Sequence, residues 1–220
     1  MCNAVRYKDI TVSYMPHLDG GGKGFGQEYI RVAKEKIGKV NHIFEYCSGP
    51  AFIGFSLMAH DLCDKLTLAD INPDAVRVCN DTIKNNNLQA KVACYLSDCL
   101  DNIPNSERWD LVVGNPPHWP SSEEKYHEDI TKYDPGLIIH KKFYRDIRKF
   151  LKPNGAILLQ ENGRATSDKD FTQMIEENGL EIIDVFKAKP LSILECILNG
   201  KKISRDTKPS PFYFMWIKPK

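Results

Sequence analysis

Four positions in the middle of the chain carry residues that suit ligand binding. They are the turn Glu45–Gly54, which contains Gly49, and the polar residues Asp70, Asp98 and Asn115. Each lies at the end of a short apolar run that reads as a buried strand. In an open α/β sheet, ligands bind beyond the carboxyl ends of the strands. We therefore expect these four positions to meet at one ligand site.

The residue types at these strand ends suit a ligand that contains a nucleoside. Gly49 lets the backbone of its turn approach a ligand closely. The carboxylate of Asp70, about twenty residues further on, can accept both hydroxyls of a ribose, and Asp98 is placed to accept from an adenine amino group. The middle glycine of a dinucleotide-binding G-x-G-x-x-G pattern is replaced by Ala51, so the turn suits a pyrophosphate poorly. A single aspartate at a strand end is more often a helix cap, but four positions in register favour binding.

The stretch Leu111–His118 is the most informative in the chain. Its apolar part ends in Asn115-Pro116-Pro117. Proline keeps the residue before it extended and has no N–H to donate. The side-chain oxygen of Asn115 and the carbonyl of Pro116 can therefore both accept from one planar NH₂ group. The alternative is a Pro-Pro loop that only stops a strand.

The elements around these positions alternate between strands and helices, which predicts a parallel sheet covered by helices on both faces. The last two strands lack a helix-length crossover, so we expect an antiparallel edge strand. The fold class is then α/β, doubly wound and Rossmann-like, with a seven-stranded, mostly parallel sheet. The expected strands are His42–Cys47, Leu66–Ala69, Lys91–Leu96, Trp109–Val113, Ala156–Leu159, Glu181–Phe186 and Phe212–Ile217. The expected helices are Gln27–Ile37, Phe52–His60, Pro73–Ile83, Ile138–Leu151 and Phe171–Asn178, the fourth of them closed by Pro153-Asn154-Gly155.

Residues 1–40 are expected to form an extension that packs on a domain over residues 41–220. The extension contains the glycine-rich stretch Asp19–Gly26. This stretch follows no strand and has no Ser or Thr after Lys23, so a phosphate-binding P-loop is not expected. It is either a plain flexible loop or a lid, and a lid would bring Phe25 and Gln27 near the ligand. The loop Trp119–Pro135 is long and polar, which is typical of a functional or mobile segment.

The strand-end residues resemble the motifs of class I S-adenosylmethionine-dependent methyltransferases. Glu45–Gly54 is similar to their motif E/D-x-G-x-G-x-G, with Cys47 and Ala51 in place of two glycines. Leu68–Asn72 resembles their ribose-binding acidic motif, and Ser97–Cys99 resembles their adenine motif. The resemblance extends from about Ile43 to Gln160. It implies S-adenosyl-L-methionine as cofactor, bound by Glu45, Cys47, Gly49, Asp70, Ile71, Asp98, Cys99 and Asn115.

The Asn-Pro-Pro stretch resembles the N/D-P-P-Y/F/W motif of amino-methyltransferases, which act on adenine, guanine or cytosine amino groups or on the glutamine amide. The resemblance implies catalytic roles for Asn115, Pro116, Pro117 and His118. His118 occupies the position at which these enzymes carry an aromatic residue that stacks on the substrate. A neutral imidazole can also stack. A single histidine at such a position is more often an ordinary loop residue than a catalytic base. Two later segments resemble HemK-type protein glutamine methyltransferases, although the N-terminal part does not resemble their helical bundle. They are Tyr133–Leu137 and Phe143–Ile147.

Three functions remain open from these resemblances. The first is methylation of a planar amide or amino nitrogen, with a protein glutamine or a small molecule favoured as acceptor. The second is methylation of an adenine N6 or guanine N2 in ribosomal or transfer RNA. The third, from another class, is a non-catalytic scaffold that binds S-adenosylmethionine. The scaffold has no need of the paired acceptors on Asn115 and Pro116. The oligomeric state stays open.

The composition narrows the class and the compartment. Thirty Lys and Arg face 29 Asp and Glu, a net charge of +1, whereas domains that bind nucleic acid usually carry a basic excess. The seven cysteines include no C-x-x-C pair, which indicates reduced thiols in a cytoplasmic protein and no metal site. No signal peptide or membrane span is expected. Two clusters of basic residues are expected to be solvated surface, and for the second the alternative is contact with a nucleic acid backbone. The first is Lys141, Lys142, Arg145, Arg148 and Lys149, and the second is Lys201, Lys202, Arg205 and Lys208.

Overall fold

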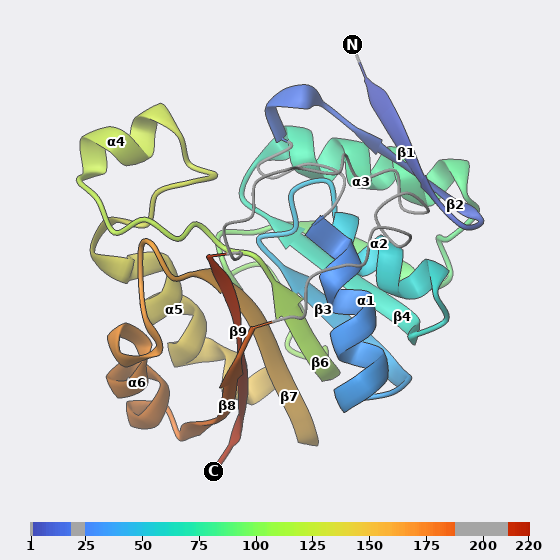
Figure 1. The fold of residues 1–220 in the computed structure, drawn as a ribbon. Helices are drawn as coiled ribbons and strands as arrows, with labels where there is room; N and C mark the ends of the chain where they lie inside the picture. Colours follow the sequence, from blue (N-terminus) through green and yellow to red (C-terminus); the bar gives the residue numbers. More distant parts are fainter. Residues whose placement is uncertain (1, 19–24, 188–210) are drawn as a thin grey trace.

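A seven-stranded sheet forms the centre of the computed structural model of the chain (Figure 1). Residues 1, 19–24 and 188–210 lie outside what the structure describes. The strands are β3 (Val40–Tyr46), β4 (Cys63–Asp70), β5 (Val92–Leu96), β6 (Trp109–Gly114), β7 (Leu151–Asn162), β8 (Leu180–Phe186) and β9 (Phe212–Pro219). They lie side by side in the order β5-β4-β3-β6-β7-β9-β8. All seven match the strands expected from the sequence.

The strand directions agree with the expected fold class. Strands β3, β4, β5, β6 and β7 pair in parallel. Strand β9 pairs antiparallel with both β7 and β8. The antiparallel pairing at this edge of the sheet is therefore confirmed. Strand β9, the last strand of the chain, lies between β7 and β8.

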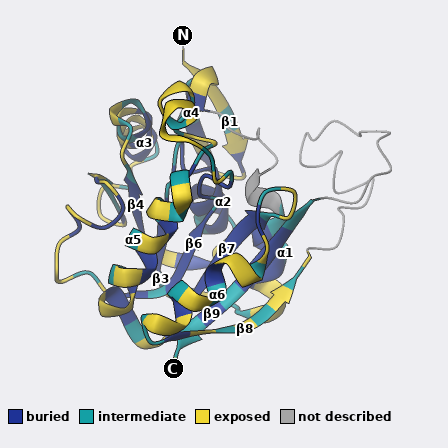
Figure 2. Ribbon diagram, turned by 90° about the vertical axis from the view of Figure 1, so that its left-hand side faces the viewer, coloured by how far each residue is buried: buried dark blue, intermediate teal, exposed yellow. Residues whose placement is uncertain are grey.

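Helices cover both faces of the sheet. Helices α1 (Phe25–Lys36), α2 (Phe52–Ala59) and α3 (Pro73–Asn85) pack on one face, and α5 (Ile138–Ile147) and α6 (Asp168–Glu177) pack on the other. Successive strand residues point to opposite faces, so Ile43 joins the first core and Phe44 the second. In Figure 2 the buried strands lie between helices whose outer sides are exposed. None of the helices within the described ranges is long and apolar enough to cross a membrane.

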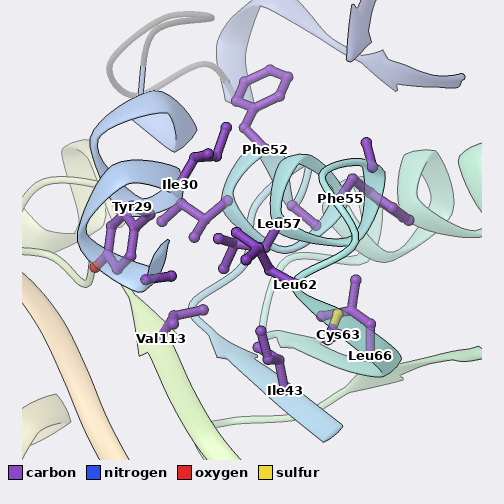
Figure 3. Packing of buried hydrophobic residues seen from close by; sticks show 14 of the residues in the cluster. Tyr29, Ile30, Ile43, Phe52, Phe55, Leu57, Leu62, Cys63, Leu66 and Val113 are labelled. Atoms are coloured by element: carbon purple, nitrogen blue, oxygen red, sulfur yellow. The ribbon is translucent and has the colours of Figure 1, made fainter. Parts of the chain in front are cut away.

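Helix α2 is the most deeply buried helix of the first face. Figure 3 shows Leu57 of this helix between α1 and Ile43 of β3, and Phe55 of the same helix belongs to the same core. Helix α1 also carries Tyr29, whose hydroxyl donates a hydrogen bond to the carbonyl of Gly114 at the end of β6. The N-terminal helix is thereby attached directly to the strand that precedes Asn115.

The N-terminal residues contain a hairpin that the sequence patterns did not predict. Strands β1 (Asn3–Tyr7) and β2 (Ile10–Tyr14) pair antiparallel. The backbone N–H of Ser13 donates to Thr82 Oγ1 of α3 at 2.9 Å, and the Tyr14 ring meets the edge of Phe52 in α2 at 5.3 Å between centroids. The hairpin thus shares the core of the first face.

The expected end of the fourth helix was wrong by a few residues. Helix α5 ends at Ile147 and is followed by the 3-10 turn Arg148–Phe150. Strand β7 already begins at Leu151, which pairs with Trp109, and pairing resumes between Ala156 and Leu111. Pro153-Asn154-Gly155, expected to close the helix, lie instead at an irregularity inside β7, because pairing with β6 continues on both sides of them.

Candidate active site

A cavity of about 650 Å³ opens at the carboxyl ends of β3, β4, β5 and β6. Its walls come mainly from the loops that follow these strands, and His17 and Leu18 of the 3-10 turn Pro16–Leu18 also contribute. The structure brings every predicted site residue to this one cavity. They are Glu45, Cys47, Gly49, Asp70, Ile71, Asp98, Cys99, Asn115, Pro116, Pro117 and His118.

The turn after β3 has an unusual backbone. Cys47, Gly49 and Ala51 all have positive φ, at 49°, 50° and 60°. A side chain in this left-handed region costs about 1–2 kcal/mol per residue. Cys47 and Ala51 therefore adopt the conformation for which the motif usually provides glycine. The turn keeps the shape of a ligand-binding loop despite these two replacements.

Asp70 holds the turn and faces the cavity at the same time. Its Oδ2 accepts the backbone N–H of Gly49 at 2.7 Å, and its Oδ1 accepts that of Asn72 at 2.8 Å. Burial raises the pKa of Asp70, and the backbone N–H groups partly offset the increase. The backbone N–H of Ile71 also interacts with this carboxylate. Because a carboxylate has about four acceptor positions, it can still accept from a ligand in the cavity. Beside it, Ile71 is 46% exposed at the cavity wall, an apolar surface on which a flat ring can pack.

Glu45 lies beneath the turn and stabilises the start of α2. Its Oε2 accepts the backbone N–H of Gly54 at 2.6 Å, and the side chain is buried. Burial raises the pKa of Glu45 to about 8, although hydrogen bonds from the backbone of Gly54 and Ile53 oppose the shift. Most of this residue's contacts are therefore with the protein's own backbone.

Asp98 and Cys99 follow β5 at the far side of the cavity. The Nζ of Lys142 in α5 lies 2.7 Å from Asp98 Oδ2 and 2.6 Å from Asp101 Oδ2. One oxygen of Asp98 is thus already paired with a cation, which the sequence did not predict. Cys99 has a φ of 51° and is buried against the hydroxyl of Tyr46 at 3.8 Å.

Asn115, Pro116 and Pro117 continue from β6 without regular structure and reach the cavity. His118 is the fourth residue of this stretch and is 8% exposed. Its Nε2 lies 3.0 Å from Asn115 Oδ1. The side-chain oxygen of Asn115 therefore has a histidine neighbour in addition to any acceptor group that enters the cavity.

Three buried residues behind His118 were missed by the sequence reasoning. His118 Nδ1 lies 3.0 Å from Glu161 Oε2, and the other oxygen of Glu161 lies 3.1 Å from His140 Nε2. His140 Nδ1 lies 2.6 Å from Asp134 Oδ2. Glu161, His140 and Asp134 have no exposed surface. We call these three residues the buried array.

The charges in the buried array support one another. Burial disfavours the charged form of His140, but Glu161 and Asp134 outweigh it and raise the pKa of His140 to about 9. Burial also opposes ionisation of Glu161, yet His140 and His118 hold its pKa below the usual value. Asp134 accepts the backbone N–H of Ile139 at 2.9 Å as well. The array is therefore a charged network, since each ionised group has a partner.

The loop after His118 forms the outer rim of the cavity. It contains the exposed helix α4 (Glu123–Glu128) and is closed by hydrogen bonds between Trp119 and residues 132 and 134. The acidic residues that line the cavity outnumber the single lysine, Lys132. They are Glu45, Asp70, Asp98, Glu128 and Asp129. Glu45, with its pKa of about 8, is largely neutral at pH 7, and Asp98 is paired with Lys142. The remaining three, Asp70, Glu128 and Asp129, still outnumber Lys132, so the lining suits a cationic ligand better than a phosphate.

The glycine-rich stretch, the basic clusters and the cysteines are described by the structure only in part. Most of the glycine-rich stretch, the side chains of Phe25 and Gln27, and the cluster Lys201–Lys208 lie outside the described residues. The other basic cluster is largely paired: Lys142 with Asp98 and Asp101, and Arg145 and Lys149 with Asp146. The six cysteines that the structure describes are free thiols. In the same part of the chain, no group of three or more potential ligands suits a metal ion.

Sequence comparisons agree with the motifs. The chain is 28% identical over 133 residues to the ribosomal protein uL3 glutamine methyltransferase of Francisella tularensis, covering 56% of this chain and 42% of the relative. It is 27% identical over 171 residues to the release factor glutamine methyltransferase of Clostridium acetobutylicum, covering 73% and 58%. The chain thus spans about half the length of these curated relatives.

Solved structures share the fold at low identity. The 16S rRNA N2 G1207 methyltransferase of T. thermophilus, in complex with AdoMet and guanosine, superposes with a TM-score of 0.65 at 12% identity, covering 100% of this chain and 50% of that one. The ribosomal protein L11 methylase of Lactobacillus delbrueckii gives 0.59 at 12% identity, covering 91% and 81%. The profile of the methyltransferase small domain matches residues 31–178. The chain belongs to the methyltransferase small domain family.

Proposed function

We propose that the chain transfers the methyl group of S-adenosylmethionine to a planar NH₂ group, with an amide acceptor favoured over a nucleobase. The observation that carries the proposal is the position of Asn115-Pro116-Pro117 at the same cavity as the turn after β3 and Asp70. A scaffold that only binds the cofactor has no use for paired oxygen acceptors there.

The cavity fits S-adenosylmethionine in three respects. Asp70 lines the cavity, where its carboxylate can accept from the ribose hydroxyls, and Ile71 offers an apolar surface to the adenine. The hydroxyl of Ser48 is buried at the cavity and has no hydrogen-bond partner, so it is available to a polar ligand. The acidic lining suits a ligand with a sulfonium and an ammonium group. The bound cofactor supplies an electrophilic methyl group.

The residues after β6 then supply the positioning. The Asn115 side-chain oxygen and the Pro116 carbonyl accept the two hydrogens of the NH₂ group and direct its lone pair toward the methyl group. Most of the barrier reduction comes from this orientation, and the two oxygens also stabilise the positive charge that grows on nitrogen.

An amide acceptor is favoured by charge and by the relatives. RNA brings phosphates that must be neutralised by Lys and Arg, and the described cavity lining carries five acidic residues and one lysine. The two curated relatives described above are named as glutamine methyltransferases. We infer a protein glutamine or a small-molecule amide as acceptor, in a reducing compartment such as the cytoplasm, where free cysteines persist.

The experiment is a labelling screen with S-adenosylmethionine that carries a deuterated methyl group. The chain is incubated separately with a soluble protein extract, total RNA and a mixture of small amides, and the products are digested and analysed by mass spectrometry. We expect label on an amide nitrogen. Label on a nucleobase would contradict the amide acceptor and identify RNA as the substrate. Tight binding of S-adenosylmethionine without label in any fraction would favour a non-catalytic scaffold.

A further inference from the structure

The buried array connects the predicted reaction site to the interior through a single residue, His118. Glu161 Oε2 and Asn115 Oδ1 lie on opposite sides of its ring, each 3.0 Å from one ring nitrogen. Both ring nitrogens are therefore engaged, which is more than an aromatic ring needs for stacking on a substrate. The ring also lies 5.8 Å from Phe212, tilted by 57°.

The array leaves one negative charge next to His118. Glu161 and Asp134 are carboxylates, and His140 between them is protonated. Three tyrosines face Glu161 from α1, α5 and β9, and burial raises the pKa of each, so they remain neutral; they are Tyr29, Tyr144 and Tyr213. A proton on His118 would complete a chain of alternating charges with no net charge. Glu161 is therefore the charged group that faces Nδ1 of His118.

The contact with Asn115 shows where such a proton lies. Nδ1 faces a carboxylate, and Nε2 faces an amide oxygen. Since a carboxylate can only accept, the neutral ring carries its hydrogen on Nδ1 and leaves Nε2 bare. Nε2 gains a hydrogen, and can donate it to Asn115 Oδ1, only when the ring takes a proton. An acceptor NH₂ group that donates to Asn115 Oδ1 would share that oxygen with His118 Nε2, which lies 3.0 Å from it.

We propose that His118 takes the proton released during methyl transfer, and that Glu161, His140 and Asp134 are positioning residues that hold its ring and balance its charge. This inference rests on the proposed function. The nitrogen forms its bond to the methyl carbon while the carbon–sulfur bond breaks and its electron pair goes to sulfur. The N–H bond then breaks, its pair stays on nitrogen, and the proton moves to Nε2. The product leaves as a neutral N-methyl amide.

Replacing His118 with phenylalanine separates a base from a stacking ring. His118→Phe keeps a flat ring of similar size and removes both nitrogens. With the acceptor found in the labelling screen, we expect kcat to fall about 10²–10⁴-fold, with KM and S-adenosylmethionine affinity changed only a few-fold. A His118→Phe enzyme with near-normal kcat would overturn the proposal, because stacking alone would then explain the residue.

Replacing Glu161 with glutamine tests the charge of the array. A base gives a kcat that rises with pH to a plateau. Glu161→Gln removes the anion that stabilises protonated His118, so the rise should move to lower pH and the plateau should fall. The matched control is Glu107→Gln, since Glu107 also lies beside a histidine, with its Oε2 3.7 Å from His42 Nε2, and at the amino end of β6. A pH profile of Glu161→Gln that matches this control would refute the role of the array.

A third measurement does not depend on turnover. Long-range ¹H–¹⁵N spectra of the histidine side chains report which ring nitrogen carries a hydrogen, and loss of a signal in His118→Phe assigns it. We expect a hydrogen-bonded Nδ1–H on His118 that is altered in Glu161→Gln and retained in Glu107→Gln. A bare Nδ1 in the wild type would contradict the array even if the enzyme is active. If the predicted spectrum is seen but no nitrogen acceptor is methylated, the proposed function fails and the array stands.

Discussion

Asp70 gives the sharpest test of the cofactor site. Asp70→Asn keeps the size of the side chain but removes its charge and one acceptor oxygen. Hydrogen bonds to a charged group contribute about 1.5–3 kcal/mol each, and the proposed function assigns two ribose hydroxyls to this carboxylate. Loss of one bond and weakening of the other amounts to about 3 kcal/mol, so the Kd for S-adenosylmethionine should rise about 10²-fold.

The assay is isothermal titration calorimetry, supported by urea unfolding. Each oxygen of Asp70 accepts one backbone N–H, from Gly49 or Asn72, so the new NH₂ group must face a donor and some stability is also lost. The matched control is Asp64→Asn, since Asp64 lies in the same strand β4 at its other end, is 53% exposed and is paired with Lys39. An unchanged Kd in Asp70→Asn, with normal binding in the control, would refute the cofactor assignment.

Two further predictions concern the framework of the site. Because burial raises the pKa of Glu45 to about 8, the folded state holds more protons than the unfolded state from about pH 4.5 to 8, and stability should fall as pH rises through this range. Glu45→Gln should flatten this dependence in thermal melts, and a slope equal to that of the wild type would contradict the raised pKa. At Gly114, an added Cβ would lie 2.6 Å from the backbone oxygen of Tyr46, so Gly114→Ala should lower the free energy of unfolding in urea by about 1–3 kcal/mol. An unaffected Gly114→Ala would mean that β3 and β6 separate easily at this point.

The sequence predicted the sheet and the cavity well because both depend on local signals. Apolar runs mark the strands, and the residues that follow them, such as Asp70 and Asn115, lie at one edge of a parallel sheet by geometry. The hairpin β1–β2 was missed because its strands are five residues each, and four of the five residues of β1 are exposed or partly exposed. Strands of five residues give too short an alternation of apolar and polar residues to be predicted from the sequence.

The buried array was missed for a different reason. Asp134, His140 and Glu161 are separated along the chain from His118, and no spacing rule brings them together. One signal was nevertheless present. Glu161 follows the apolar run Ala156–Leu159, so the rule applied to the other strand ends would have selected it too. The pairing with His140 comes from the packing of α5 against β7, and the pairing with His118 comes from the stretch that follows β6, the neighbour of β7 in the sheet.

The central claim is that Asn115 orients the acceptor nitrogen for methyl transfer. The most direct measurement is kcat of Asn115→Ala with the labelled acceptor, alongside calorimetric binding of S-adenosylmethionine to the same variant. We predict a fall in kcat of about 10²–10³-fold, with cofactor affinity within a few-fold of the wild type. Asn115→Asp should keep part of the activity, because a carboxylate also accepts. A near-normal kcat in Asn115→Ala would contradict the account and assign the chemistry to other residues.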